Sequence, residues 1–278
     1  MLSKNWSKIV QSLQNKKNRK QEGLFFVEGA KNVLEALNSD FILEKLFVTE
    51  EFLEEYKDKN LREIVLTPPL GVGGLEIATE KELIQAGTLQ SNNAALAVFK
   101  MKENVLIYPE NEFVVFLDNV QDPGNLGTII RLCDWYGIKK LICTPNTVDF
   151  YNPKTIAATM GSFTRVQVCY CAPKPFFEVI SANSGGKDSF YQHIPVFGAF
   201  MEGENVHKID FKTDFQVNEN GQIENISNGV IVMGNEANGI SDEIMPYINR
   251  KITIPRFGNA ESLNVGVATA IILDNLRR

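Results

Sequence analysis

Residues 118–131, DNVQDPGNLGTIIR, follow the apolar run FVVFL at 113–117 and lead into a helical pattern. This order of strand, turn and helix is where many α/β proteins bind phosphate with the free N–H groups of a helix start. The turn nevertheless has two glycines and lacks the lysine and the glycine spacing of a phosphate-binding loop. Asn125 is expected to cap the helix, and Arg131 follows Gly127 by one helical turn.

Arg131 can be interpreted in two ways. Helical side chains lean toward the helix N-terminus, so its guanidinium would reach back over Gly127 and, with the N–H groups of the turn, form a site for a phosphate or a sugar edge. Alternatively, Gly127 only permits close packing, and Arg131 pairs with Asp134 or another surface carboxylate. This stretch alone favours neither interpretation.

Two further apolar runs end in polar loops. GVIVMGNEANGISDEI, residues 229–244, predicts a buried strand, a loop and a helix over 241–249 with Ser241 as its N-cap. KITIPRFGNAESLNVGVATAII, residues 251–272, predicts a strand, a loop and a helix over 262–276, in which Gly266 and Ala270 permit close packing. Together with 118–131, these strand ends predict a shared cleft at the carboxyl edge of one sheet.

The whole chain reads as two α/β domains. Short apolar runs alternate with helical patterns over 22–100, including a strand-like REIVLT at 62–67, and a polar stretch at 100–111 suits a linker. We therefore expect a small α/β domain at 1–105 and a second domain at 106–278. Several runs of the second domain are apolar throughout, which is typical of a mostly parallel sheet covered on both faces. Helices are expected between them, at 125–136, 153–161, 174–182, 241–249 and 262–276, and a hairpin turn at Asn220–Gly221.

Composition narrows the class of protein. The chain has 278 residues, 44% of them hydrophobic, and no run near the roughly 18 apolar residues of a membrane span. Its start lacks the apolar core of a secretory signal, so we expect a cytoplasmic protein without a membrane partner. Four cysteines in apolar context and two histidines give no metal-ligand spacing, and Cys169 and Cys171 are expected to be core thiols rather than a redox pair.

The net charge of −6 argues mildly against a nucleic-acid partner, but its distribution argues for one. Residues 1–21 carry no acidic residue, and we expect RNA contacts from the basic side chains Lys16, Lys17, Arg19 and Lys20. The alternative is a solvated basic helix at a frayed terminus.

The motifs Asn119–Arg131, Gly234–Ile240 and Ile254–Ala268, in this order, resemble those of the SpoU (TrmH-type) RNA ribose 2′-O-methyltransferases of the SPOUT superfamily. The resemblance covers 112–278. The preceding region looks like the substrate-binding domain that many members carry, most of all in VEGAKNVLEAL at 27–37. Family members are knotted, so the resemblance implies a trefoil knot in the second domain. It also implies a homodimer with an active site near the subunit interface.

The resemblance also implies residue roles. S-adenosylmethionine, without a metal, would be held through backbone and apolar contacts by Gly234, Ile254 and Leu263, with Asn235 and Asn264 beside them. The ribose and phosphate of a structured RNA, ribosomal rather than transfer, would meet the catalytic group Asn125, Arg131, Glu236, Ser262 and Asn264. A guanidinium stays protonated in proteins, so Arg131 is expected to fix a phosphate and stabilise the developing alkoxide, with proton removal assisted by phosphate or water.

The motifs argue against two other classes of protein. A catalytically silent RNA-binding paralogue should have lost polar motif residues, and all are present here. A nicotinamide-dependent dehydrogenase would need a G-x-G-x-x-G turn, which DPGNLG does not supply.

The chain departs from the family pattern at Thr128, where alanine is common, at Leu132-Cys133-Asp134, and at Gly266, where serine or alanine is frequent.

Overall fold

The computed structural model describes residues 2–56, 74–110, 112–182, 194–211 and 228–278. The chain forms two compact units, of which the first contains Met1–Glu103 and Asp149–Thr164 and the second contains Asn104–Val148 and Arg165–Arg278. The break after Glu103 lies beside the boundary expected at 105/106. The segment Asp149–Thr164, however, was expected in the second domain and packs with the first unit.

The first unit is built on a four-stranded sheet with the order β1-β4-β2-β3. Strand β4 is antiparallel to β1 and β2, whereas β3 is parallel to β2. The elements in chain order are α1 (Lys4–Ser12), α2 (Lys16–Glu22), β1 (Leu24–Glu28), α3 (Ala30–Leu37), β2 (Leu43–Val48), α4 (Glu50–Glu55), β3 (Leu75–Ile77), α6 (Glu80–Ala86), β4 (Ala95–Lys100), α8 (Pro153–Thr159) and the 3-10 helix η2 (Ser162–Thr164). The strand expected at 62–67 lies outside the described residues.

The basic N-terminal arm is part of the core of this unit. Val10 and Leu13 are fully buried and pack in one cluster with Phe26 and Phe47 of the sheet and Leu83 of α6. Ser3 caps α1 by accepting a hydrogen bond from the Trp6 N–H. The alternative of a frayed, solvated terminus is therefore wrong, because burying these apolar side chains fixes the arm.

The segment Asp149–Thr164 joins the first unit through aromatic packing and an ion pair. The ring of Phe163 lies 5.7 Å from that of Phe41, and Tyr151 lies 4.6 Å from Phe25. Asp149 accepts hydrogen bonds from the guanidinium of Arg19, which is 1% exposed. Local sequence patterns cannot show which core a segment will enter, because these contacts join residues more than 100 positions apart.

Arg19 therefore differs from the neighbouring lysines. Its Nη1 donates to the carbonyl oxygens of Leu13 and Gln14 at 2.7 and 3.0 Å, and its other donors face Asp149. The expected RNA contact by Arg19 is wrong for this conformation, since the guanidinium is buried and occupied. Lys16, Lys17 and Lys20 are exposed.

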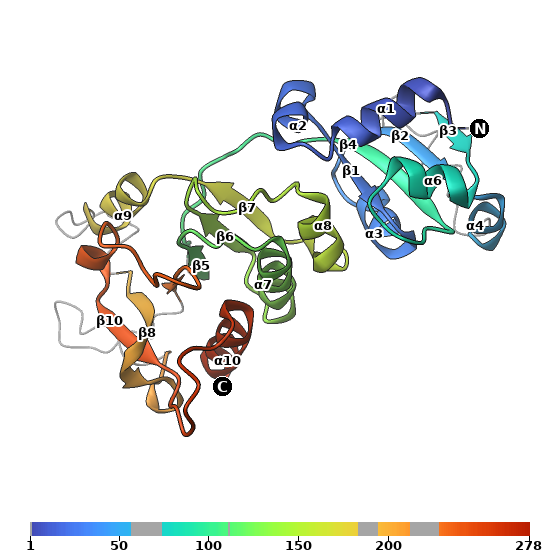
Figure 1. Ribbon diagram of the computed structural model, residues 1–278. Coiled ribbons are helices and arrows are strands. Elements are labelled where there is room, and N and C mark those ends of the chain that lie inside the picture. Colours follow the sequence, from blue (N-terminus) through green and yellow to red (C-terminus); the bar gives the residue numbers. More distant parts are fainter. Residues whose placement is uncertain (1, 57–73, 111, 183–193, 212–227) are drawn as a thin grey trace. The chain divides into compact units, whose positions relative to one another are not determined.

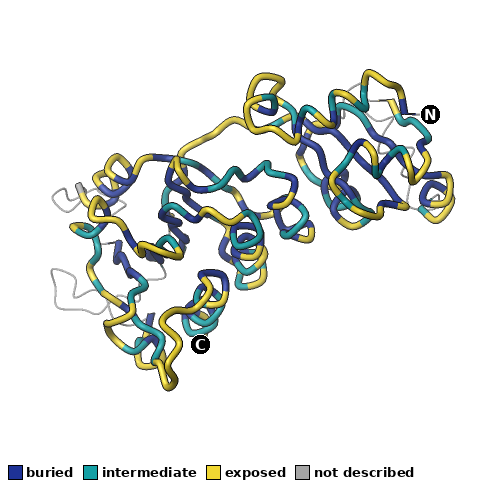
Figure 2. The backbone as a smooth tube through the Cα atoms, viewed as in Figure 1, coloured by how far each residue is buried: buried dark blue, intermediate teal, exposed yellow. Residues whose placement is uncertain are grey.

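The second unit is built on a six-stranded sheet with the order β10-β8-β9-β5-β6-β7, in which every neighbouring pair is parallel. This confirms the expected α/β fold with a mostly parallel sheet. The elements are β5 (Phe113–Leu117), α7 (Pro123–Trp135), β6 (Lys140–Cys143), β7 (Gln167–Tyr170), α9 (Pro173–Ala182), β8 (Val196–Asn205), η3 (Val206–Lys208), β9 (Gly229–Met233), η4 (Met245–Tyr247), β10 (Arg250–Thr253) and α10 (Val265–Arg277). Figure 2 shows that strands of both sheets are largely buried.

Helices position the polar loops of this sheet. Helix α9 covers one face, where its Phe176 and Phe177 pack on Val114 and Phe116 of β5. Helices α7 and α10 pack against each other (Figure 1). The helix expected over 241–249 is wrong: this stretch forms turns and the short η4, because Pro246 lacks an N–H and disfavours a helical residue before it. The hairpin turn expected at Asn220–Gly221 lies outside the described residues.

The cysteines are buried and unpaired, as expected for core thiols. Burial raises the pKa of the Cys133 and Cys143 thiols well above the ordinary value, so both stay protonated at neutral pH. Over the described ranges, no helix is long and apolar enough to span a membrane, and no group of three His, Cys, Asp or Glu side chains could hold a metal ion.

The buried ion pair gives a test of how the arm is held. Arg19→Met should lower the free energy of unfolding of the first unit by about 3 kcal/mol, because it leaves the Asp149 carboxylate, which is 12% exposed, without its cation. Arg19→Met/Asp149→Leu should recover part of this loss, and Lys20→Met, at an exposed neighbour, should change little. Urea unfolding followed by Trp6 fluorescence in a Trp135→Phe background measures this. An unchanged midpoint in Arg19→Met would show that Arg19 does not hold the arm.

Candidate functional site

The loops after β5 and β9 are joined at the carboxyl edge of the second sheet. The Asp118 N–H donates to the Met233 carbonyl at 2.9 Å, and the Ser241 N–H donates to Asp118 Oδ2 at 2.7 Å. The Asn235 side-chain nitrogen donates to the Asn119 carbonyl at 2.7 Å. Ser241, expected as a helix cap, is thus a backbone donor that closes the junction of the two loops.

The loop 234–239 folds back tightly on itself. Asn235 and Gly239 exchange two backbone hydrogen bonds of 2.9 and 3.0 Å, and Asn235 Oδ1 accepts from the N–H groups of Ala237 and Asn238. A Cβ atom at Gly234 would lie 2.3 Å from the carbonyl carbon of Gly239. Only glycine fits at 234, because the two backbone segments approach more closely than any side chain allows.

The caps of α7 and α10 differ from those expected. Asp122, not Asn125, caps α7, since Asp122 Oδ1 accepts from the Asn125 N–H at 2.7 Å. Helix α10 begins at Val265 rather than at 262, and its cap is Asn264, whose Oδ1 accepts from the N–H groups of Gly266 and Val267. Neither Asn125 nor Ser262 is therefore needed for capping.

A chain of hydrogen bonds links the three motifs. With Oδ1 of Asn264 occupied by the helix cap, its Nδ2 donates to Asn125 Oδ1 at 2.9 Å. Asn125 Nδ2 then donates to Glu236 Oε1 at 2.8 Å. An amide has one acceptor end and one donor end, so the cap of α10 fixes the direction of every bond as far as the Glu236 carboxylate. Asn125, Glu236 and Asn264 are thus brought together, as expected for a shared cleft.

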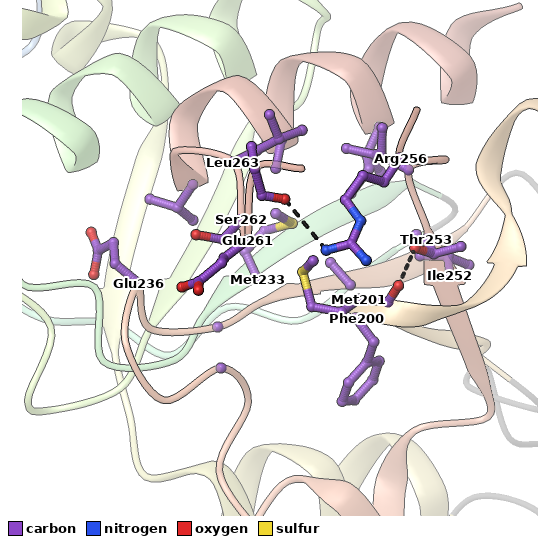
Figure 3. A pocket seen from close by; sticks show the side chains of 18 of the residues that line it. Phe200, Met201, Met233, Glu236, Ile252, Thr253, Arg256, Glu261, Ser262 and Leu263 are labelled. Carbon is purple, nitrogen blue, oxygen red and sulfur yellow. Dashed lines mark hydrogen bonds between the residues drawn. The ribbon is translucent and has the colours of Figure 1, made fainter. Parts of the chain in front are cut away.

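Beside this chain lies a cavity of about 760 Å³. Its lining includes the expected residues Gly234, Asn235, Glu236, Ile254, Ser262 and Leu263. Figure 3 shows the side chains of Glu236, Glu261 and Ser262 toward one side of it, with Met201, Met233 and Leu263 among the sticks. Asn125 and Asn264 are not part of the lining and are joined by hydrogen bonds to Glu236, which is.

The sequence alone did not indicate that β8 and Arg256 contribute to the lining of the cavity. Ala199, Phe200 and Met201 of β8 line the cavity, because β8 lies between β9 and β10 in the sheet. The apolar run PVFGAF at 195–200 is typical of a strand. Its carboxyl end lies at the same edge of the parallel sheet as the three loops, which is the signal that could have indicated its role.

Arg131 lies exposed on α7, outside the cavity lining. Its alternative partner Asp134 instead accepts from Arg165 at 3.0 Å. Within the described residues, the Arg131 guanidinium has no hydrogen-bond or ion-pair partner. The pairing of Arg131 with Asp134 is therefore not found among the described residues.

Thr128 and Gly266, two of the positions that depart from the family pattern, lie against each other where α7 contacts α10. A Cβ atom at Gly266 would lie 3.2 Å from Cγ2 of Thr128. The absent side chain at Gly266 thus makes room for the larger side chain at Thr128, which holds the start of α10 close to α7.

This cavity suits an organic ligand with an apolar body and a polar end. Its volume falls within the range of ligand pockets, and its lining combines the apolar Met233, Ile252 and Leu263 with the charged Glu236, Arg256 and Glu261.

Comparisons with known proteins relate both units to RNA-modifying proteins. Residues 112–274 match the SpoU rRNA Methylase family, and residues 6–70 match an MRM3-like substrate binding domain. The chain is 28% identical over 275 residues to the 23S rRNA (guanosine(2553)-2′-O)-methyltransferase RlmP of Bacillus subtilis (strain 168), covering 99% of this chain and 95% of that protein.

Solved structures resemble the chain over its whole length. A TrmH-family protein from Porphyromonas gingivalis has a TM-score of 0.80 and 30% identity, with 100% of this chain and 98% of that one covered. An rRNA methyltransferase from Sinorhizobium meliloti, solved with bound AdoMet, has a TM-score of 0.79 and 27% identity, with 100% and 95% covered.

Glycines of the cavity provide a matched test of its geometry. Gly234→Ala should destabilise the second unit by about 1–3 kcal/mol, because its new methyl group must displace the backbone at Gly239. Gly258→Ala, also in the lining, should change little, since nothing lies within 4 Å of its added Cβ. Thermal unfolding compares the two variants. Equal melting temperatures would contradict the close backbone approach.

Proposed function

Because the chain belongs to the SpoU rRNA Methylase family and is therefore an S-adenosylmethionine-dependent RNA 2′-O-methyltransferase, we propose that its substrate is a ribosomal RNA rather than a transfer RNA. The observation that carries the proposal is the likeness to a 23S rRNA methyltransferase over 99% of the chain, including the first unit. The match of residues 6–70 to a substrate-binding domain supports the same substrate class.

The described residues fit S-adenosylmethionine at the cavity. Gly234, Ile254 and Leu263 line it together, and Asn235 closes the loop that forms one wall. When bound there, the cofactor supplies a methyl group on a positively charged sulfur, which a nucleophile takes by in-line displacement. We propose that the backbone at Gly234 and the loop 254–263 hold the adenosine part, with Asn264 acting through the cap of α10.

The ribose side is proposed to lie at Glu236. Asn125 holds Oε1 of this carboxylate, and among the described residues Oε2 has no protein partner. A free carboxylate oxygen in a fixed position can accept a hydrogen bond from the ribose 2′-hydroxyl and orient it for attack. Ser262, in the same lining, offers a second hydroxyl contact. Positioning of this kind needs no metal.

Arg131 is proposed to bind the phosphate next to the target ribose and to stabilise the alkoxide as it forms. Its exposure and lack of a described protein partner support this role. Because a guanidinium does not lose its proton in proteins, Arg131 acts through charge and hydrogen bonds, and the proton leaves to phosphate or water.

RNA affinity is proposed to come largely from the first unit. Lys16, Lys17 and Lys20 are exposed on α2, which the ion pair of Arg19 with Asp149 holds on the folded core. A fixed cluster of ammonium groups neutralises phosphates without sequence preference.

We also propose a knotted second unit, a homodimer and a cytoplasmic enzyme, as family resemblance implies. The bond between Asn264 and Asn125, which are 139 positions apart, supports a chain end that returns through this region. Trp135, Leu263 and Val267 are 80%, 49% and 50% exposed on and beside α7 and α10, which supports an interface with a second copy there.

Mapping of 2′-O-methyl groups tests the substrate class. Ribosomal and transfer RNA from cells with and without the gene should differ at a ribosomal nucleotide, and the purified protein should restore that methyl group in vitro. A lost methyl group in transfer RNA alone would overturn the proposal.

Arg131→Ala should fold and bind cofactor normally but slow methyl transfer by a factor on the order of 10² or more. Arg131→Lys should rescue little, because lysine keeps the charge but not the planar fork. Single-turnover transfer to substrate RNA, with calorimetry of S-adenosylmethionine binding on the same preparations, measures both properties. Near-wild-type transfer by Arg131→Ala would exclude its catalytic role.

The lysines of α2 can be compared with equal charges elsewhere on the first unit. Lys16→Gln/Lys17→Gln should weaken RNA binding and reduce the slope of log affinity against log salt by roughly 1–2. The control Lys31→Gln/Lys81→Gln removes the same charge from α3 and α6. Filter binding over a range of salt concentrations compares them. An equal effect of both pairs would mean that only net charge matters, and α2 would lose its assigned role.

A further inference from the structure

Arg256 is distinctive among the residues that line the cavity. It is the one cationic side chain in the described lining, whereas Glu236 and Glu261 are carboxylates. Figure 3 shows its guanidinium extending into the cavity from the side opposite to Glu236, above Met201. Arg256 is itself an exposed residue, so its guanidinium is accessible to a ligand that enters the cavity from solvent.

Few of the N–H donors of this guanidinium are hydrogen-bonded within the described part of the protein. Its one described hydrogen bond runs from Nη1 to the Ala260 carbonyl at 3.4 Å, which is long for such a bond. Other arginines of the second unit are paired more closely: Arg165 with Asp134 at 2.9 Å, and Arg278 with Asp274 at 2.6 Å. A guanidinium has five N–H donors, so most of those of Arg256 remain available to a ligand.

We propose that Arg256 binds the α-carboxylate of the methionine part of S-adenosylmethionine. This inference rests on the proposed function and names a contact within it. The planar fork of arginine matches a carboxylate with two parallel hydrogen bonds, and the apolar walls at Met233 and Ile252 strengthen such a pair.

The charges of the lining favour this ligand over an RNA phosphate. S-adenosylmethionine carries two cations, its sulfonium and its ammonium, and one carboxylate. The lining offers the complementary set, with the carboxylates of Glu236 and Glu261 and the single cation of Arg256. A phosphodiester could pair with Arg256 but, unlike S-adenosylmethionine, brings no cation for the carboxylates of the lining. In Figure 3 the carboxylates of Glu236 and Glu261 lie across the cavity from Arg256.

Two neutral-sulfur ligands separate this contact from the rest of the site. S-adenosylhomocysteine contains the amino-acid group, whereas 5′-methylthioadenosine lacks it. Arg256→Met should weaken calorimetric binding of S-adenosylhomocysteine on the order of tenfold or more and leave that of 5′-methylthioadenosine within about twofold. Arg256→Lys should recover part of the loss. Lys139→Met, which removes one exposed charge elsewhere in the same unit, should change neither affinity.

Other outcomes would overturn the assignment. Equal weakening of both ligands would show that Arg256 only shapes the wall, and unchanged binding of both would show no contact. Unchanged cofactor binding with a raised KM for RNA would assign the residue to a phosphate. If the wild-type protein bound neither ligand, the proposed function itself would fail, a result distinct from any effect of the Arg256 variants.

Discussion

The side chain of Asn264 makes the interaction on which the rest of the site depends. Its oxygen accepts hydrogen bonds from the first N–H groups of α10, so its nitrogen is the end that faces Asn125. Asn125 must then present its own nitrogen to Glu236. An aspartate at 264 could cap the helix but could not donate to Asn125, and an alanine could do neither. A helix start and a carboxylate at the cavity are thus fixed by one amide.

Close backbone approach provides the other constraint. The cavity wall at 234–239 exists because a glycine at 234 lets two backbone segments pass at a distance that excludes a Cβ atom. A glycine also stands at the contact of α7 with α10, where a Cβ atom at Gly266 would lie close to the side chain of Thr128. Thr128 and Gly266 each depart from the family pattern alone. In this structure they lie against each other, since a Cβ atom at Gly266 would come within 3.2 Å of the Thr128 methyl group.

Much of the fold could be predicted from the sequence because burial leaves a direct pattern. The strands of the parallel sheet are apolar runs, and the polar loops at their ends were correctly expected to meet. Local patterns failed where a single residue or a distant contact decides the outcome. Pro246 prevents the helix expected over 241–249, and Arg19 is buried because it meets Asp149, 130 positions away. The sequence alone did not indicate a role for Arg256, because only the folded loop shows which way its side chain faces.

A crystal structure of the protein with S-adenosylhomocysteine tests this arrangement most directly. We expect the adenosine part to occupy the cavity between residues 234–239 and 254–263, with Asn264, Asn125 and Glu236 still joined by hydrogen bonds beside it. A ligand bound elsewhere, or an Asn125 side chain turned away from Glu236 in the complex, would contradict it.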